Sequence, residues 1–290
     1  MRVKIVAWFF IPTAIILLAV AITNFLSYQR VTEDLVIERD QEVTRLSASQ
    51  LSSKLDDFTQ LLGGIARNTN LLHSDPNVRQ QALQRAIGGL GQAVFDGGVV
   101  VVDRFGIVQT VEPPRPEILG HDWADRPYFR QILRTSGPVF SNINSDGTGA
   151  GEVVSLAVPI LGSEGQLNGV LQGMFRLGAP AVSSFYGEIV KLRIAESGSA
   201  YLVDGNGRVI YHSNVDSIGA DFSDIPVVRQ VILGNTSAVR TQDSDGDAIV
   251  AAYSPVLGTP WGLVTEEDWS VLTSSSQGFQ RLLMLLLALG

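Results

Sequence analysis

The chain has 290 residues, of which 45% are hydrophobic and 17% are charged, and its formal net charge is −8. This length suits two domains of ordinary size, and the apolar content is typical of a folded protein rather than a disordered one. The negative charge argues against a nucleic-acid-binding surface, which needs clustered lysine and arginine. Because the chain has no cysteine, disulfides, thiolate metal sites and a cysteine nucleophile are all excluded.

Residues 1–28 are predicted to form a transmembrane helix. An almost unbroken apolar run occupies residues 5–22, close to the roughly 20 residues that a helix needs to cross the hydrocarbon core. Two basic residues, Arg2 and Lys4, precede the run and favour a cytoplasmic N-terminus. Small residues near the end of the run also resemble a cleavage site, so a removed signal peptide is the alternative. In the favoured interpretation residues 29–276 are extracytoplasmic.

Residues 29–70 are predicted to continue as a long extracytoplasmic helix. Proline is absent between Val31 and Ile65, and glycine occurs there only at positions 63 and 64. Apolar residues recur at alternating steps of four and three, which places them in one stripe on a helix. These residues are Leu51, Leu55, Phe58, Leu62 and Ile65. We expect the lower part of the helix to pair with a second copy of the chain. A stalk with no role in signalling is the alternative.

The region beyond this helix contains the same plan twice. Four blocks recur in the same order: Val102–Val108 and Val203–Val209, Gly120–Trp123 and Gly219–Phe222, Asp125–Gln131 and Asp224–Gln230, and Val153–Gly162 and Ile249–Gly258. Each copy reads as a strand, a tight turn and a strand, then a short helix that begins at Asp-x-Pro, then further strands joined by Gly-rich turns. The repeat predicts two related modules, residues 71–190 and 191–272, each a small antiparallel sheet with helices on one face.

Residues 277–290 are predicted to be the start of a second transmembrane helix. Residues 282–289 are almost entirely leucine, and an exposed helix would leave these side chains uncovered. A C-terminal amphipathic anchor is the alternative. A cytoplasmic output domain would follow a second transmembrane helix, and the sensor does not reveal whether it is a kinase, a chemotaxis transducer or a cyclase.

Several of these blocks resemble the double Cache family, the extracytoplasmic sensors of chemoreceptors, sensor histidine kinases and cyclic-dinucleotide enzymes. The resemblance covers roughly residues 35–272 and is most specific in Asp122–Phe129, Val139–Ser141, Val153–Pro159, Gly198–Asp204 and Thr259–Val264. It implies an α+β fold: a long N-terminal helix with two stacked PAS-like antiparallel-sheet modules, flanked by transmembrane helices. It also implies that a ligand binds in the membrane-distal module.

Differences between the two copies independently indicate which module binds the ligand. Positions that serve only the fold should stay alike, whereas Arg126, Tyr128 and Phe129 of the first copy correspond to aliphatic residues in the second. A guanidinium group beside aromatic rings suits a small carboxylate. We therefore expect the pocket in the first module. The alternative for Arg126 is a surface ion pair with Asp122 or Asp125.

The resemblance also bears on the ligand. In related amino-acid receptors the matching positions are an arginine followed by two aromatic residues, and an aspartate on a late strand usually holds the ligand's ammonium group. That aspartate is replaced here by Met174. Because a buried ammonium without a partner is costly, we expect a small organic acid, or another ligand without an amine. Four further residues are expected to line the same cavity: Trp123, Ser141, Ser155 and Gln172.

The expected function is therefore the ligand-sensing region of a transmembrane signal-transduction receptor, working as a homodimer. No nucleophile elbow, phosphate-binding loop or dinucleotide fingerprint occurs, and the three histidines have no metal-ligand spacing. We expect no catalysis in this region, no cofactor, no metal and no nucleic acid partner. One alternative is a receptor with a vestigial pocket that senses through a partner binding protein. Another is the sensor of an amino-acid chemoreceptor.

Overall fold

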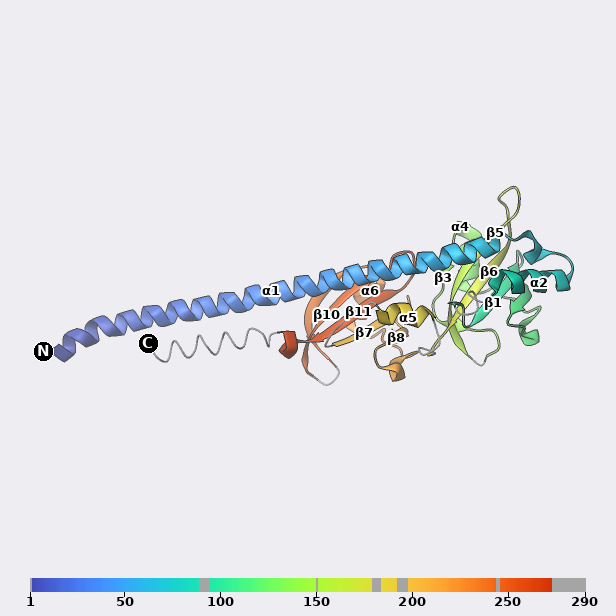
Figure 1. Ribbon diagram of the computed structural model, residues 1–290. Coiled ribbons are helices and arrows are strands. Elements are labelled where there is room, and N and C mark those ends of the chain that lie inside the picture. The colour runs from blue at the N-terminus through green and yellow to red at the C-terminus, as the bar shows by residue number, and fades with distance from the viewer. Residues whose placement is uncertain are drawn as a thin grey trace.

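A single long helix, α1 (Arg2–Ala66), runs beside the rest of the protein in the computed structural model, which describes residues 2–88, 94–149, 151–178, 184–191, 198–243 and 246–272. Its 65 residues correspond to a length of about 100 Å. Figure 1 shows α1 passing along both sheets and projecting beyond them towards the N-terminus. The predicted apolar stripe packs on the sheets, and its buried or partly buried members are Leu51, Leu55, Phe58, Leu62 and Ile65.

The predicted transmembrane helices flank the sheets in the sequence. Residues 2–28 form the first part of α1, and residues 277–290 lie outside the described part of the chain. Among the residues whose side chains are described, no helix combines the length and the apolar character that crossing a membrane requires. Both transmembrane segments therefore stay predictions.

The first sheet has six antiparallel strands in the order β2-β1-β6-β5-β3, with β4 also paired to β5. The strands are β1 (Gly98–Asp103), β2 (Val108–Glu112), β3 (Val139–Phe140), β4 (Asn144–Ser145), β5 (Glu152–Leu161) and β6 (Leu167–Arg176). The accompanying helices are η1 (Thr69–Leu72), α2 (Pro76–Ile87), η2 (Pro116–Ile118) and α4 (Pro127–Thr135). In the longest pairing, Ser155 of β5 lies opposite Met174 of β6, and Ala157 lies opposite Gln172.

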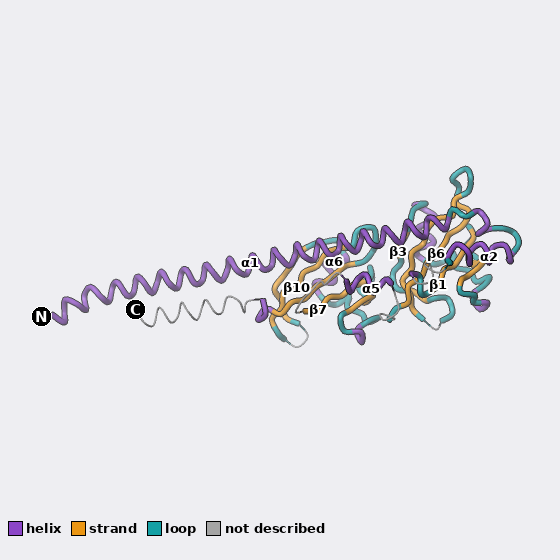
Figure 2. Tube along the Cα trace, in the orientation of Figure 1, coloured by secondary structure: helices purple, strands orange, loops and turns teal. Residues whose placement is uncertain are grey.

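The second sheet has five antiparallel strands in the order β8-β7-β11-β10-β9. They are β7 (Gly198–Val203), β8 (Val209–His212), β9 (Ser237–Gln242), β10 (Ala248–Pro255) and β11 (Gly262–Asp268), accompanied by α5 (Ser184–Lys191), η3 (Val215–Ser217) and α6 (Pro226–Ile232). This order repeats that of the first sheet, so the predicted duplication is confirmed. Figure 2 shows the two groups of strands following one another along α1.

The turn after the first strand of each module shows why the sequence repeats there. Asp103 and Asp204 each accept two backbone N–H bonds through one carboxylate oxygen. Gly106 and Gly207 have φ values of 92° and 85°, which side chains rarely tolerate. A Cβ on Gly106 would also lie 2.6 Å from the backbone of Ala124. Glycine is therefore required at this turn.

The helix of each module begins at proline, as the Asp-x-Pro pattern predicts. In the first copy α4 starts at Pro127, and Arg126 rather than the aspartate is the N-cap residue. Asp125 instead pairs with Arg130 within the helix, and the second copy contains the same kind of ion pair. The pattern thus predicts the start of the helix correctly. The aspartate does not cap the helix but forms an ion pair with an arginine in its first turn.

The first sheet buries both of its faces. Residues such as Val99 and Leu171 point into the core shared with α1, α2 and α5. Their neighbours Val100, Val170 and Met174 point to the opposite side, into the core beneath α4. Because side chains alternate along a strand, every second residue of β1 and β6 faces the space between the sheet and α4.

The two modules meet at residues 140–145. The indole N–H of Trp261 donates to the carbonyl oxygen of Ser141 across 2.9 Å, and the backbone N–H of Ile143 donates to the buried carboxylate of Asp204 across 3.0 Å. These bonds join the strand end of the first module to the turn and a core aromatic residue of the second.

Candidate ligand-binding site

The start of α4 positions the predicted aromatic residues. Proline at the first helical position fixes the backbone there, so Tyr128 and Phe129 follow in the first turn and are both buried against the sheet. Trp123, which precedes the helix, is buried in the same core. The tight approach of Gly147, whose Cβ would lie 2.6 Å from the Trp123 ring, closes the loop over this indole.

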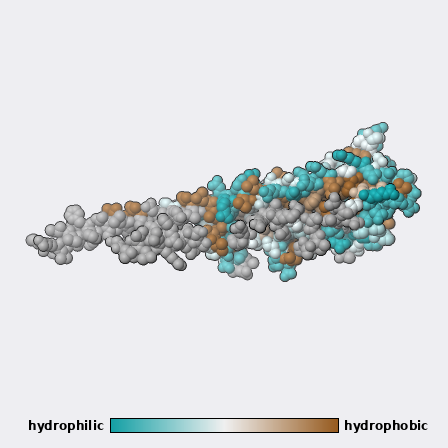
Figure 3. Space-filling model, in the orientation of Figure 1, coloured by the Kyte–Doolittle hydropathy of each residue, from teal (hydrophilic) through white to brown (hydrophobic). Residues whose placement is uncertain are grey.

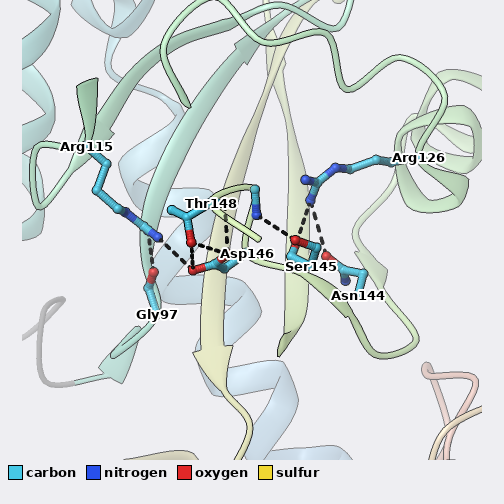
Figure 4. Close-up of polar contacts among 8 residues, drawn as sticks. Gly97, Arg115, Arg126, Asn144, Ser145, Asp146 and Thr148 are labelled. Atoms are coloured by element: carbon cyan, nitrogen blue, oxygen red, sulfur yellow. Dashed lines mark hydrogen bonds and ion pairs between the residues drawn. The ribbon is translucent and has the colours of Figure 1, made fainter. Parts of the chain in front are cut away.

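Arg126 lies half-buried above this core. Its guanidinium group stacks on the Trp123 ring, 3.7 Å from the ring centroid. One guanidinium nitrogen, Nη1, donates to Asn144 Oδ1 across 3.2 Å and to the carbonyl oxygen of Ser145 across 3.0 Å (Figure 4). The alternative, a surface ion pair with Asp122 or Asp125, is not found among the described residues: Asp125 pairs with Arg130, and Asp122 accepts from the backbone N–H of Ala124. Arg126 is therefore held by an aromatic face and neutral acceptors.

A chain of buried polar groups lies beneath α4 and the Arg126 loop. The Tyr128 hydroxyl donates to Gln172 Oε1 across 2.6 Å, and Gln172 Nε2 donates to Ser155 Oγ across 2.8 Å. The Ser155 backbone N–H and the Asn144 amide both donate to Ser141 Oγ, across 2.9 and 2.8 Å. Since Asn144 also accepts from Arg126, the structure brings five of the predicted residues into one connected network.

The phenol of Tyr128 stays protonated in this environment. Burial raises the pKa of Tyr128 to about 12, although the nearby charge of Arg126 opposes the shift. The hydroxyl is therefore neutral at pH 7, and its one hydrogen is donated to Gln172 Oε1. The charged donor of the site is the Arg126 guanidinium, which suits an anionic oxygen.

Phe129, Trp123 and Met174 form the apolar part of the candidate site. All three are buried in the core beneath α4, and Met174 lies two residues from Gln172 on the same face of β6. Met174 brings no carboxylate to this face. The predicted residues thus divide into a polar network and an apolar wall.

The second module lacks the polar network. From the strand registers and the repeat, the counterparts of Tyr128, Ser155 and Gln172 are Val227, Ala251 and Val264. Their side chains are all part of the apolar core beneath α6. The difference between the copies therefore extends from the helix to two strands, because these three positions carry hydrogen-bonding side chains in the first module and aliphatic ones in the second.

Sequence reasoning missed three residues at the site: Asn144, Asp146 and Arg115. Asn144 and Asp146 belong to a segment that reads as a Gly-rich turn. Arg115 is 14% exposed, donates to the carbonyl oxygen of Gly97 across 2.5 Å and lies 3.6 Å from a carboxylate oxygen of Asp146. Its place between prolines at positions 114 and 116 was a usable signal, because prolines restrict the backbone on both sides.

A cavity of about 690 Å³ lies at the junction of the modules, with Ser145 in its lining. The described residues that line it include Glu152 of the first module and Ile218 of the second, and none of the predicted site residues. A bidentate ion pair between Arg208 and Glu152, with N–O distances of 2.9 and 3.0 Å, crosses the same junction. The cavity therefore lies at the module junction and meets the Arg126 network at Ser145, whose carbonyl oxygen accepts from Arg126.

A long helix that carries two antiparallel sheets of one topology, with the Tyr128–Gln172–Ser155 network beneath α4 of the first, defines a tandem PAS-like fold. Residues 28–276 match the dCache_1 model of the Cache domain. The chain belongs to this family, and its fold is that of the double Cache domains.

Solved structures of similar fold are ligand-binding domains. The ligand-binding domain of the Pseudomonas fluorescens chemoreceptor CtaA in complex with L-isoleucine has a TM-score of 0.61 and 18% identity, covering 87% of this chain and 99% of that chain. The domain of the Pseudomonas aeruginosa amino-acid chemoreceptor PctB with L-Arg has a TM-score of 0.59 and 20% identity, covering 82% and 97%. The ligand-binding domain of the Pseudomonas aeruginosa chemoreceptor PctC in complex with GABA has a TM-score of 0.58 and 21% identity, covering 78% of this chain and 97% of that chain.

A curated relative is the methyl-accepting chemotaxis protein McpG of Pseudomonas putida, which is 25% identical over 157 residues. The match covers 51% of this chain and 23% of McpG. The chain thus spans about a quarter of the length of that relative.

Proposed function

We propose that this chain is the sensing region of a transmembrane receptor and binds a small organic acid between α4 and the first sheet. The observation that carries the proposal is the Arg126 guanidinium, which stacks on Trp123 and connects through Asn144 to a buried network that ends at Tyr128. An arginine guanidinium suits a carboxylate, because its planar set of N–H donors matches the two carboxylate oxygens. The second module, in which the corresponding positions are apolar, serves as the contrast.

The absence of a carboxylate at Met174 supports an acid without an amine. CtaA and PctB were solved with amino acids and PctC with GABA, so an amino acid is the second candidate. Propionate and L-alanine share a carbon skeleton and differ in the amine. Isothermal titration of the full chain in detergent micelles with both ligands decides between the two, because an acid-binding site favours propionate and an amino-acid site favours L-alanine.

Replacing Arg126 tests the site itself. A charge-assisted hydrogen bond contributes about 1.5–3 kcal/mol, so Arg126→Gln should weaken binding of the acid by roughly 10- to 100-fold. Arg130→Gln is the matched control on the same helix, because the Arg130 side chain is 60% exposed and pairs with Asp125. Equal affinities of the Arg126→Gln variant and the unchanged chain would remove Arg126 from the site. If no acid or amine raises the melting temperature of the chain, the result favours a receptor that senses through a partner binding protein.

We further propose the arrangement in the membrane. Residues 1–28 and the segment that begins at 277 cross the bilayer, residues 71–190 form the distal module, and residues 191–272 form the proximal module. The distal module would close on its ligand and shift the proximal module and the helix that follows it. The ligand would drive this change by binding the closed state of the receptor more tightly than the open state.

The receptor is proposed to be a homodimer that pairs through α1. Val31, Leu35 and Leu46 are exposed on this helix, and Leu35 and Leu46 lie about three turns apart on one side of it. Figure 3 shows apolar residues on the surface of α1 where it leaves the sheets.

Because the chain has no cysteine, oxidative cross-linking of single cysteine variants tests the dimer cleanly. Leu35→Cys should give a disulfide-linked dimer. Asp34→Cys, about 100° further round the helix, should cross-link much more slowly. Equal rates for the two variants would contradict pairing through this side of α1.

A further inference from the structure

Arg115 is a buried cation whose donors are only partly used. Its side chain is 14% exposed, and among the described residues its Nε is buried without a hydrogen-bond partner. The neighbouring carboxylate of Asp146 is 3.6 Å away, longer than a hydrogen bond. Asp146 meanwhile accepts from the backbone and the hydroxyl of Thr148. A buried guanidinium with an unused donor is costly unless another acceptor reaches it.

Arg115 and Arg126 approach the same loop from opposite sides. Arg126 holds Asn144 and Ser145, while Arg115 faces Asp146. Figure 4 shows the two guanidinium groups pointing towards this loop from its two flanks. The short loop therefore lies between two cations, and of the two, among the described residues, Arg115 alone has an ion-pair partner, Asp146.

The surroundings of Arg115 connect it to the apolar end of the candidate site. A Cβ on Gly98 would lie 2.6 Å from Arg115 Nη2, and a Cβ on Gly97 would lie 2.8 Å from the Cβ of Met174. Two glycines in succession thus make room for the guanidinium beside the strand position that pairs with Met174. The site has a cation at each end and no carboxylate on β6 at Met174.

We propose that the ligand is a dicarboxylate, with one carboxylate bound by Arg126 and the other bound by Arg115 in place of Asp146. The inference rests on the proposed acid-binding function of the same site and names its ligand class. Asp146 then acts as an internal substitute for the second carboxylate. A ligand with two separated carboxylates would use the free donor of Arg115 and leave the Asp146–Thr148 turn intact.

Succinate and butyrate provide the test, because they have the same number of carbons and differ in one carboxylate. Isothermal titration of the full chain in detergent micelles should show succinate binding at least tenfold more tightly than butyrate. Arg115→Gln should reduce the succinate affinity to that of butyrate and leave butyrate within twofold. Asp146→Asn, which removes the competing carboxylate, should tighten succinate severalfold and leave butyrate unchanged.

The outcomes separate the two levels of the proposal. Equal binding of both acids by the unchanged chain, or a succinate preference that survives Arg115→Gln, overturns the dicarboxylate inference and leaves the acid site standing. Binding of neither acid overturns the proposed function as well. Inorganic phosphate that competes with succinate at similar affinity indicates one doubly charged group and not two carboxylates, which also overturns the inference. If Arg115→Gln fails to fold, the succinate preference of the unchanged chain and the Asp146→Asn result decide together.

Discussion

The candidate site depends on single hydrogen-bonding groups that have no access to water. Gln172 and Ser155 are fully buried, and each uses its side chain to satisfy a neighbour: Gln172 accepts from Tyr128 and donates to Ser155. In such a network the loss of one partner leaves the other unpaired, and this costs more than the bond itself contributes. The network should therefore respond strongly to conservative substitutions.

Tyr128→Phe removes one hydroxyl and leaves Gln172 Oε1 without its donor. We expect the free energy of unfolding to fall by about 1–3 kcal/mol, measured by urea denaturation of the full chain in micelles. Tyr253→Phe is the control, because the Tyr253 ring is buried and its hydroxyl makes no hydrogen bond among the described residues. Similar losses in the two variants would contradict the special cost of breaking the network.

The pH dependence of stability tests the same tyrosine. Because the pKa of Tyr128 is raised to about 12, the unfolded chain loses this proton near pH 10 while the folded chain retains it. The contribution of Tyr128 to stability is therefore complete below pH 10 and is lost as the pH rises towards 12. The stability difference between the unchanged chain and Tyr128→Phe should shrink over this range. A difference that stays constant would show that the phenol titrates normally in the folded chain.

At the scale of elements, α1 presents two kinds of surface to the two sheets. Towards the first module it buries leucines such as Leu55 and Leu62. Towards the second it buries polar residues, among them Asp40 and Thr44, and the Thr44 hydroxyl is 2.7 Å from that of Thr265 on β11. The helix is thus fixed by apolar packing on the first module, and on the second by the polar contact of Thr44 together with the apolar contacts of Val36 and Ile37.

Asp40 is a local source of instability on this helix. One of its carboxylate oxygens is buried without a partner among the described residues, while Arg39 lies 3.2 Å from the other. Burial raises the pKa of Asp40, and Arg39 opposes this only in part. Asp40→Asn should therefore raise the free energy of unfolding at pH 7 by about 1 kcal/mol.

The gain should depend on pH. When the pKa of an aspartate is higher in the folded than in the unfolded chain, its protonated form stabilises the fold fully below the pKa of the unfolded chain, and this contribution is lost as the pH rises. The gain in stability from Asp40→Asn should therefore diminish towards pH 4. Asp56→Asn, an exposed position on the same helix, should change stability by less than about 0.5 kcal/mol. Chemical denaturation at pH 4 and pH 7 measures both. An equal gain at both values would show that charge is not the cause.

The sequence predicted the elements better than it predicted their contacts. The repeat gave two modules because matched turns and strand ends recur in order, and the shared sheet topology follows from them. The two-residue strands β3 and β4 were missed, since they are too short to show a period of two. Comparison of the copies selected Tyr128 and Arg126, but the acceptors of Arg126 are 18 and 19 residues away in a turn.

Arg115 was missed for a similar reason. Its contacts are to the backbone of Gly97 and to Asp146, and no helical or strand period links these positions. Local patterns predict which residues belong to one face of an element. They do not predict which loops close over that face, and the second cation of the site lies on such a loop.

At the scale of the whole molecule, three hydrogen bonds join the modules within residues 141–143. Besides the bonds of Ser141 and Ile143, the Asn142 side chain accepts from the backbone N–H of Gly205 across 3.0 Å. Trp261 is fully buried at this junction and contacts Phe140 edge-on, with ring centroids 5.2 Å apart. The junction therefore combines specific hydrogen bonds with a buried aromatic contact.

Trp261→Phe keeps an aromatic ring and removes the indole N–H. The carbonyl of Ser141 then loses its donor, so the free energy of unfolding should fall by about 1–3 kcal/mol plus the cost of the smaller ring. Leu257→Ala, an exposed position in the preceding turn, should stay within about 0.5 kcal/mol. Calorimetric unfolding of both variants measures the difference. An unchanged melting temperature for Trp261→Phe would contradict a structural role for this bond.

The short stretch around Ser141 belongs to two structures at once, because its hydroxyl serves the polar network of the first module while its carbonyl is bound by the second. This limits how sensor halves can be exchanged between receptors. A hybrid that grafts the first module onto a foreign second module must also carry over Trp261 and the Asp204–Gly205 turn, or supply equivalents. In recombination between such genes, a crossover between the two sheets would therefore separate residues that depend on one another.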